Sequence, residues 1–155
     1  MKAGSDVQVR VTHRFEASAE RVFDAWLDTH WIGRWMFGKA LRDEEIVRLT
    51  LEARVGGKFS FVVRRQGQEI DHVGRYLELE RPRRLVFTWG IAGVSDTDES
   101  RVVVEIAPRE PRGNESTGCE LTLTHFLPAE WADYADRARD GWSKMVGELA
   151  AALDR

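Results

Sequence analysis

The sequence predicts an α+β domain of order β-α-α-β6-α, in which a curved seven-stranded antiparallel sheet wraps around a long C-terminal helix. Three observations carry this prediction. Residues 7–15 alternate between apolar and polar side chains, residues 45–126 keep strand-like patterns that no helical period interrupts, and residues 127–153 follow a helical period. Strands that follow one another without intervening helices pair antiparallel. At 155 residues the chain is expected to form a single domain, 1–155.

The first elements are expected to be one strand and two short helices. Residues 7–15 place valines, His13 and Phe15 on one face, which is the period of a half-buried strand. Ser18 is a suitable N-cap for a helix that runs to Leu27. Thr29 starts the second short helix, and it places Trp31 and Trp35 on one side because they stand four residues apart.

Six further strands are predicted in the middle of the chain. Gly56 and Gly57 form a tight connection between the first two, so these read as a hairpin. The alternation slips between Val73 and Tyr76 near Gly74, which predicts a β-bulge. Polar stretches at 93–100 and 108–118 are expected to be loops. The predicted strands are residues 47–53, 59–63, 70–79, 85–91, 102–106 and 121–126.

The C-terminal segment 127–153 is predicted to be one amphipathic helix. Pro128 suits its first turn, where the missing N–H has no helical partner. Gly141 and Gly147 lie inside it and indicate either a close approach of another element or a local bend. Its apolar stripe is centred, at about 100° per residue, on Trp131, Ala135, Trp142 and Leu149.

Composition excludes several function classes. Lys and Arg number 23 against 26 Asp and Glu, for a net charge of −3, and both signs are interspersed, so no nucleic-acid partner is expected. The sequence has no signal peptide and no membrane-spanning run, which predicts a cytoplasmic protein without membrane insertion. The single Cys119 is expected to be a buried, inert thiol. Metal-ligand spacing and a glycine-rich phosphate loop are absent, so no metal, cofactor or catalytic residue is assigned.

A twisted sheet and a straight helix do not fit together along their whole length, which predicts a cavity between them. Apolar pockets with a few polar groups are typical ligand sites. Each aromatic side chain could equally be ordinary core, and each histidine could be satisfied by a local partner. The residues expected to line the cavity are Trp35 and Phe37 of the second short helix, Phe59, Phe61, His72, Trp89 and His125 of the sheet, and Trp142 and Met145 of the long helix.

Several segments, in the right order, resemble the SRPBCC or START-like superfamily, and more narrowly the branch named after the activator of the heat-shock-protein-90 ATPase. No single segment is specific, and the resemblance rests on their order along nearly the whole chain. The segments are Ala19 to Trp26, the Trp31 and Trp35 pair, Val55 to Phe59, Gly74, Arg81 to Trp89, Leu121 to His125, and Gly141 with Trp142.

The resemblance implies a helix-grip fold with a deep hydrophobic cavity, but the superfamily includes carriers, cyclases and a co-chaperone domain, so the fold does not settle the function. We expect non-enzymatic binding of a small hydrophobic molecule, such as a lipid, a polyketide-like compound or an aromatic metabolite. One alternative is a cyclase or hydrolase that uses His72 or His125 as a general acid or base. The other is an interaction module that contacts a chaperone or a second copy of the chain.

Overall fold

The computed structural model describes residues 7–93, 100–109 and 118–154. The loops predicted at 93–100 and 108–118 fall largely outside this part of the chain, as does the N-terminal stretch. The strands are β1 (Val7–Phe15), β2 (Glu45–Leu51), β3 (Lys58–Arg65), β4 (Gln68–Glu80), β5 (Arg84–Thr88), β6 (Gly90–Ile91), β7 (Arg101–Pro108) and β8 (Cys119–Leu127). The helices are α1 (Ala19–Ala25), α2 (Thr29–Trp35), the 3-10 helix η2 (Ala129–Tyr134) and α3 (Ala135–Leu153).

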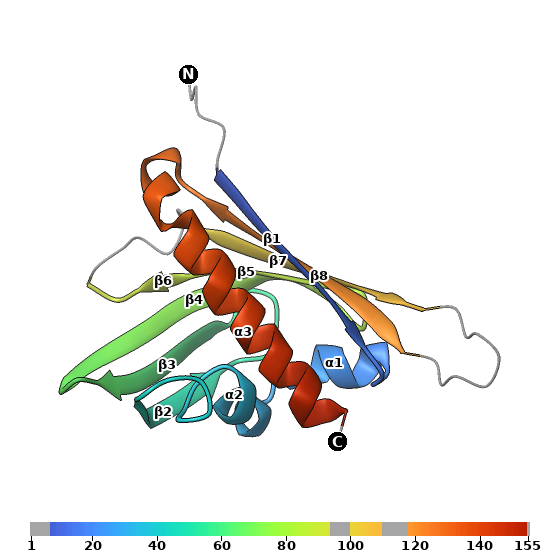
Figure 1. The fold of residues 1–155 in the computed structure, drawn as a ribbon, viewed down its shortest axis with the longest axis horizontal. Coiled ribbons are helices and arrows are strands. Elements are labelled where there is room, and N and C mark those ends of the chain that lie inside the picture. The colour runs from blue at the N-terminus through green and yellow to red at the C-terminus, as the bar shows by residue number, and fades with distance from the viewer. Residues whose placement is uncertain (1–6, 94–99, 110–117, 155) are drawn as a thin grey trace.

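The sheet confirms the predicted helix-grip architecture. Its main path runs β1-β8-β7-β5-β4-β3-β2, and every pairing is antiparallel. Helix α3 crosses one face of this curved sheet, and α1 and α2 lie beside the C-terminal half of α3 (Figure 1). We call the sheet face toward α3 the inner face and the opposite one the outer face.

The predicted strand 85–91 is divided in two. Residues 84–88 form β5, which pairs with β4 and β7, whereas Gly90 and Ile91 form β6 and pair with Val73 and His72 of β4. Trp89 lies between the two strands. The sheet therefore has eight strands, not seven, because the 13-residue β4 pairs with β5 through residues 76–80 and with β6 through residues 72–73.

The bulge in β4 lies further along the strand than the sequence predicted. The register shifts between Tyr76 and Glu78, not at Gly74, and a second shift in β2 lies between Ile46 and Arg48. Gly74 has a different role. A Cβ there would lie 2.0 Å from the Thr88 carbonyl oxygen and 2.6 Å from the Phe59 ring, so only glycine lets these groups approach.

The two short helices begin where their capping residues predict. The Ser18 hydroxyl accepts a hydrogen bond from Arg21 N at 3.2 Å, and the Asp28 carboxylate accepts one from His30 N at 2.9 Å. Trp35 is fully buried, whereas Trp31 is only partly buried, with the Arg34 guanidinium over its ring. The sequence predicts Phe37 within the second short helix, but α2 ends at Trp35 and Phe37 lies just beyond it.

The predicted single C-terminal helix is wrong in its first turns. Strand β8 continues to Leu127, and η2 follows, interrupted by non-helical φ and ψ angles of −100° and 19° at Trp131. This kink lets Trp131 pack against a small cluster that contains Val9 and Ala138. From Ala135 onward α3 is regular, and its buried residues are Ala138, Trp142, Val146, Leu149, Ala150 and Leu153.

The interior glycines of α3 do not mark a close approach. A Cβ at Gly147 would meet no atom within 4 Å, and one at Gly141 would meet only the end of Met145 at 4.0 Å. No helix in the described part of the chain is long and apolar enough to cross a membrane.

Candidate functional site

Aromatic side chains from the sheet and all three α-helical segments meet between the inner face and α3. Neighbouring ring centroids are 4.5 to 6.4 Å apart, within the usual range for packed aromatic pairs. We call this set the aromatic interior. It consists of Trp26, Trp35, Phe37, Phe59, Phe61, His72, Tyr76, Phe87, Trp89, His125 and Trp142.

The structure brings together all nine residues that the sequence predicted for the site. Trp89 and Met145 are partly exposed and pack on the main core cluster, while the other seven are buried. The rings touch one another directly, as in the stacked pair Phe59 and Phe61 at 4.7 Å and the tilted pair Trp89 and Trp142 at 5.3 Å. The predicted lining residues thus pack directly against one another, and the open cavity that the sequence predicts between them is not confirmed.

His125 is held between two partners in the centre of this interior. Its Nδ1 accepts a hydrogen bond from Trp142 Nε1 at 3.0 Å, so in the neutral ring Nε2 carries the proton and donates to Ser100 Oγ. Burial lowers the pKa of His125 from 6.5 to about 4 because the charged ring would be desolvated. His125 is therefore neutral near pH 7, and its Nε2 has no lone pair with which to take the Ser100 proton.

His72 is also arranged as a neutral, buried ring. Its Nδ1 donates to the Phe61 carbonyl oxygen at 3.0 Å across the β3–β4 pair, and its ring packs against Phe37 and Trp89. Burial is the main cause that lowers its pKa, and the Arg65 guanidinium lowers it further. Among the described residues no carboxylate hydrogen bonds to either histidine. Neither ring thus has the oriented base or acid partner that general acid–base chemistry uses.

A buried carboxylate that the sequence analysis missed organises the loop between α2 and β2. The Glu44 side chain is fully buried and accepts hydrogen bonds from Arg65 at 2.7 Å, Arg42 at 3.0 Å and the Gly38 backbone N–H at 2.8 Å. Lys144 of α3 also donates to the Leu41 carbonyl oxygen. These bonds fix the loop that carries Phe37 over Phe61 and His72. No local pattern in the sequence marks Glu44 as buried, because its partner Arg65 lies 21 residues away.

Trp26 is the second residue that sequence reasoning left out of the site. It lies at the C-terminal end of α1 and is 2% exposed. Its indole Nε1 is buried and has no hydrogen-bond partner. An unsatisfied buried donor costs about 1–3 kcal/mol, so such groups are uncommon and call for a reason.

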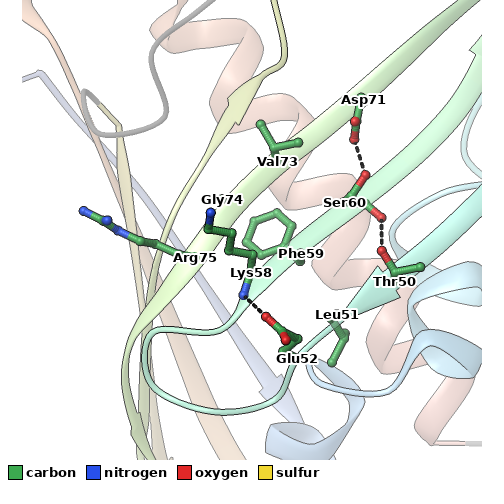
Figure 2. Close-up of a pocket in the computed structure, with 10 residues that line it drawn as sticks. All are labelled: Thr50, Leu51, Glu52, Lys58, Phe59, Ser60, Asp71, Val73, Gly74 and Arg75. Atoms are coloured by element: carbon green, nitrogen blue, oxygen red, sulfur yellow. Dashed lines mark hydrogen bonds between the residues drawn. The ribbon is translucent and has the colours of Figure 1, made fainter.

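The outer face of β2, β3 and β4 carries a hollow of about 620 Å³. Its lining mixes polar and apolar side chains, with Leu51, Phe59 and Val73 among the apolar ones. The polar side chains are hydrogen-bonded: Ser60 donates to Asp71 at 2.7 Å, Thr50 donates to the Ser60 carbonyl oxygen at 3.3 Å, and Glu52 accepts from the Lys58 backbone at 3.1 Å (Figure 2). The hollow is open to solvent, and Phe59 belongs both to its lining and to the aromatic interior. In the described part of the chain, no group of three or more His, Cys, Asp or Glu side chains is placed to hold a metal ion.

Cys119 is the buried thiol that its position predicted. It is 0% exposed, its Sγ lies 3.5 Å from the Ala17 carbonyl oxygen, and burial raises its pKa to about 11. A thiol with a raised pKa is a poor nucleophile near neutral pH.

A curved antiparallel sheet closed by one long helix over an aromatic interior defines an α+β helix-grip domain. Comparison with known families places it more narrowly. The chain belongs to the family of Activator of Hsp90 ATPase homolog 1-like proteins, whose family model matches residues 16–154. This confirms the resemblance that the sequence motifs carry.

Solved structures share the fold at low sequence identity. A protein from Rhodobacter sphaeroides is 20% identical, with a TM-score of 0.75 over 97% of this chain and 95% of that one. CalU16 from Micromonospora echinospora is 24% identical, with a TM-score of 0.68 over 99% of this chain and 80% of that one. The Aha1 dimer from Colwellia psychrerythraea is 18% identical, with a TM-score of 0.66 over 96% of each chain. The search of curated protein sequences found no match.

Proposed function

We propose that this protein binds a small, largely apolar molecule in the aromatic interior between the sheet and α3, without catalysing a reaction. The observation that carries the proposal is the continuity of this interior with the surface. Trp89 and Met145 are partly exposed, and Trp89 also contacts the buried rings of Phe59 and Trp142. A ligand would enter where these two side chains swing outward.

Apolar burial would provide the binding free energy. Each Å² of apolar surface removed from water contributes about 25 cal/mol before the cost of ordering is subtracted. Phe87 packs edge-to-face with both Phe59 and Trp89. A flat aromatic or ring-shaped ligand can pack against rings in this arrangement. Two observations weigh against the cyclase or hydrolase alternative: the bonding of His125, and the lack of a carboxylate partner for either histidine among the described residues.

An NMR titration tests this proposal. A fatty acid, a polycyclic aromatic hydrocarbon and an aromatic ketone would be added in turn, and the tryptophan indole signals followed. We expect at least one compound to shift the signals of Trp89 and Trp142, and Trp89→Ala to weaken that binding at least about tenfold, equivalent to about 1.4 kcal/mol. Trp31→Ala is the matched control, since Trp31 is another partly exposed tryptophan outside the aromatic interior. If no compound shifts the Trp89 and Trp142 signals, the proposal fails.

Contact with a second copy of the chain or with a chaperone is the second candidate. Edge strand β2 exposes Ile46 and Val47 at 38% and 39%, which is unusual for apolar side chains on an unpaired sheet edge. The similar Colwellia protein is a dimer, and the family takes its name from an Hsp90 ATPase activator. Sedimentation of the wild type and of Val47→Lys, alone and with purified Hsp90, tests this candidate. A monomer that does not sediment with Hsp90 contradicts it. The cytoplasmic location stays a prediction.

A further inference from the structure

The indole N–H of Trp26 is a buried donor without an acceptor, and it lies inside the aromatic interior. Trp26 is 2% exposed, and its Nε1 makes no hydrogen bond. Arg109 Nε is also unpaired, but Arg109 adjoins residues 110–117, which lie outside the described part of the chain. Trp26 and the three rings that pack against it all lie in the described part of the chain.

The two buried tryptophans that neighbour Trp26 both pair their indole N–H groups. Trp35 Nε1 donates to the Ala25 carbonyl oxygen at 3.1 Å, and Trp142 Nε1 donates to His125 Nδ1 at 3.0 Å. Trp26 packs against the rings of Trp35, Phe87 and Trp142, with centroids 4.5, 6.1 and 6.2 Å away. These three ring contacts bring no oxygen acceptor to Trp26.

The charged groups around the aromatic interior indicate whether an acceptor for Trp26 Nε1 would be charged or neutral. His125 is neutral and both of its ring nitrogens are used. The guanidinium groups of Arg42 and Arg65 are paired with the buried Glu44 carboxylate. A ligand carboxylate beside Trp26 would therefore be buried without a cation, which is strongly unfavourable. A neutral oxygen acceptor satisfies the N–H without bringing in a charge.

We propose that the molecule bound in the aromatic interior is an uncharged, ring-shaped compound with a carbonyl-type oxygen, and that Trp26 Nε1 donates a hydrogen bond to this oxygen. This inference rests on the proposed function. It makes Trp26 the residue that selects ketone-like ligands over hydrocarbons of the same shape, because a hydrocarbon leaves the donor unpaired.

Fluorene and 9-fluorenone test the inference, since they share a three-ring shape and differ by one ketone oxygen. Both are titrated into the wild-type protein and into Trp26→Phe, which removes the N–H but keeps an aromatic ring. We expect the ratio of fluorenone to fluorene affinity to be about five- to tenfold higher in the wild type than in the variant. Fluorene is the reference in each protein, so a change in apolar packing caused by the smaller ring affects both ligands and cancels in the ratio.

The wild-type indole spectrum gives a second measurement that does not depend on how well the variant folds. Fluorenone should move the Trp26 Nε1–H proton signal downfield, as a new hydrogen bond does, whereas fluorene should not. Trp35 is the internal control, because its N–H group is already bonded to the Ala25 carbonyl oxygen. If both compounds bind equally in both proteins and the Trp26 signal responds alike to each, this inference is wrong and the proposed binding function stands. If neither compound binds, both fall.

Discussion

The two faces of β3 and β4 are made from alternate residues of the same strands, yet they have opposite characters. On the inner face all three of Phe59, Phe61 and His72 are buried: Phe59 stacks on Phe61, and His72 packs against Phe37 and Trp89. On the outer face Ser60 and Asp71 bond to each other beside an open hollow. The apolar pattern thus marks where side chains pack, and the space open to solvent lies on the polar side. A binding function on the inner face requires side chains to move, and the following predictions test this contrast.

The largest effect is expected for Trp142→Ala on the inner face. The change removes a ring that contacts Trp26, Trp89 and His125, and it leaves His125 Nδ1 without its donor. We expect the free energy of unfolding to fall by about 4 kcal/mol, measured by urea denaturation. Trp142→Phe is the control: it keeps a ring and loses the hydrogen bond, at about 1–2 kcal/mol. A fall below about 1 kcal/mol for Trp142→Ala would mean that the ring borders an open cavity.

The second-largest effect is expected from His125 on the inner face, which makes the free energy of unfolding depend on pH. Its folded-state pKa of about 4 lies below the unfolded value near 6.5, so a proton binds more tightly to the unfolded chain. Its contribution is therefore complete above about pH 6.5 and is lost as the pH falls toward about 4. Between about pH 7.5 and about pH 4, the wild type should lose about 3 kcal/mol more unfolding free energy than His125→Gln.

Denaturant titrations of both proteins at the two pH values measure this difference. The pKa of His72 is also lowered, but that histidine is present in both proteins and cancels. Equal pH dependence in the two proteins would show that His125 is not buried as a neutral ring.

Gly74→Ala tests the close approach of Thr88 and Phe59 to the backbone of β4. The new Cβ would collide with the Thr88 carbonyl oxygen and the Phe59 ring, so we expect a loss of about 2 kcal/mol in urea denaturation. Gly147→Ala is the contrasting control. Its new Cβ would meet no atom within 4 Å, and alanine favours a helix interior over glycine, so the free energy of unfolding should rise by about 1 kcal/mol. Equal effects of the two changes would contradict the packing described for Gly74.

The smallest effect is expected on the outer face. Ser60→Ala removes the 2.7 Å hydrogen bond to Asp71, but water in the open hollow can replace it, so the loss should be about 1 kcal/mol or less. Thermal unfolding compares this variant with Thr50→Val, which removes the weaker 3.3 Å bond to the Ser60 carbonyl oxygen. If Ser60→Ala lowered the free energy of unfolding by nearly as much as Trp142→Ala, the two faces would not differ in their contribution to stability.

Much of the fold could be predicted because its signals are local. Alternation gave β1 at its observed bounds, and the hydroxyl of Ser18 and the carboxylate of Asp28 cap helices that begin one residue later. The errors arose where distant segments decide the outcome. Two segments of β4 pair with β5 and β6 on either side of Trp89, and the start of the last helix is interrupted at Trp131, which packs on a cluster with Val9 of β1.

The candidate site shows the same division. All nine predicted residues come together, most of them because strand or helix periodicity assigns them to the face that must be buried. Phe37 and Trp89 lie outside regular elements, and the chain around them carries them to the same place. Ser100, Glu44 and the unpaired Trp26 N–H were not predicted as site features, since each depends on partners far away in the chain. Glu44 and Arg65 are 21 residues apart, and no spacing rule links them.

The sequence by itself determined which side chains face inward, since strand and helix periods are properties of neighbouring residues. It also determined the family, through an ordered series of short segments. Only the tertiary structure decided whether the inward rings leave space, which histidine nitrogen holds its proton, and which indole lacks an acceptor. Those outcomes depend on contacts among β8, α1 and α3, whose positions relative to each other are set by packing across the whole domain.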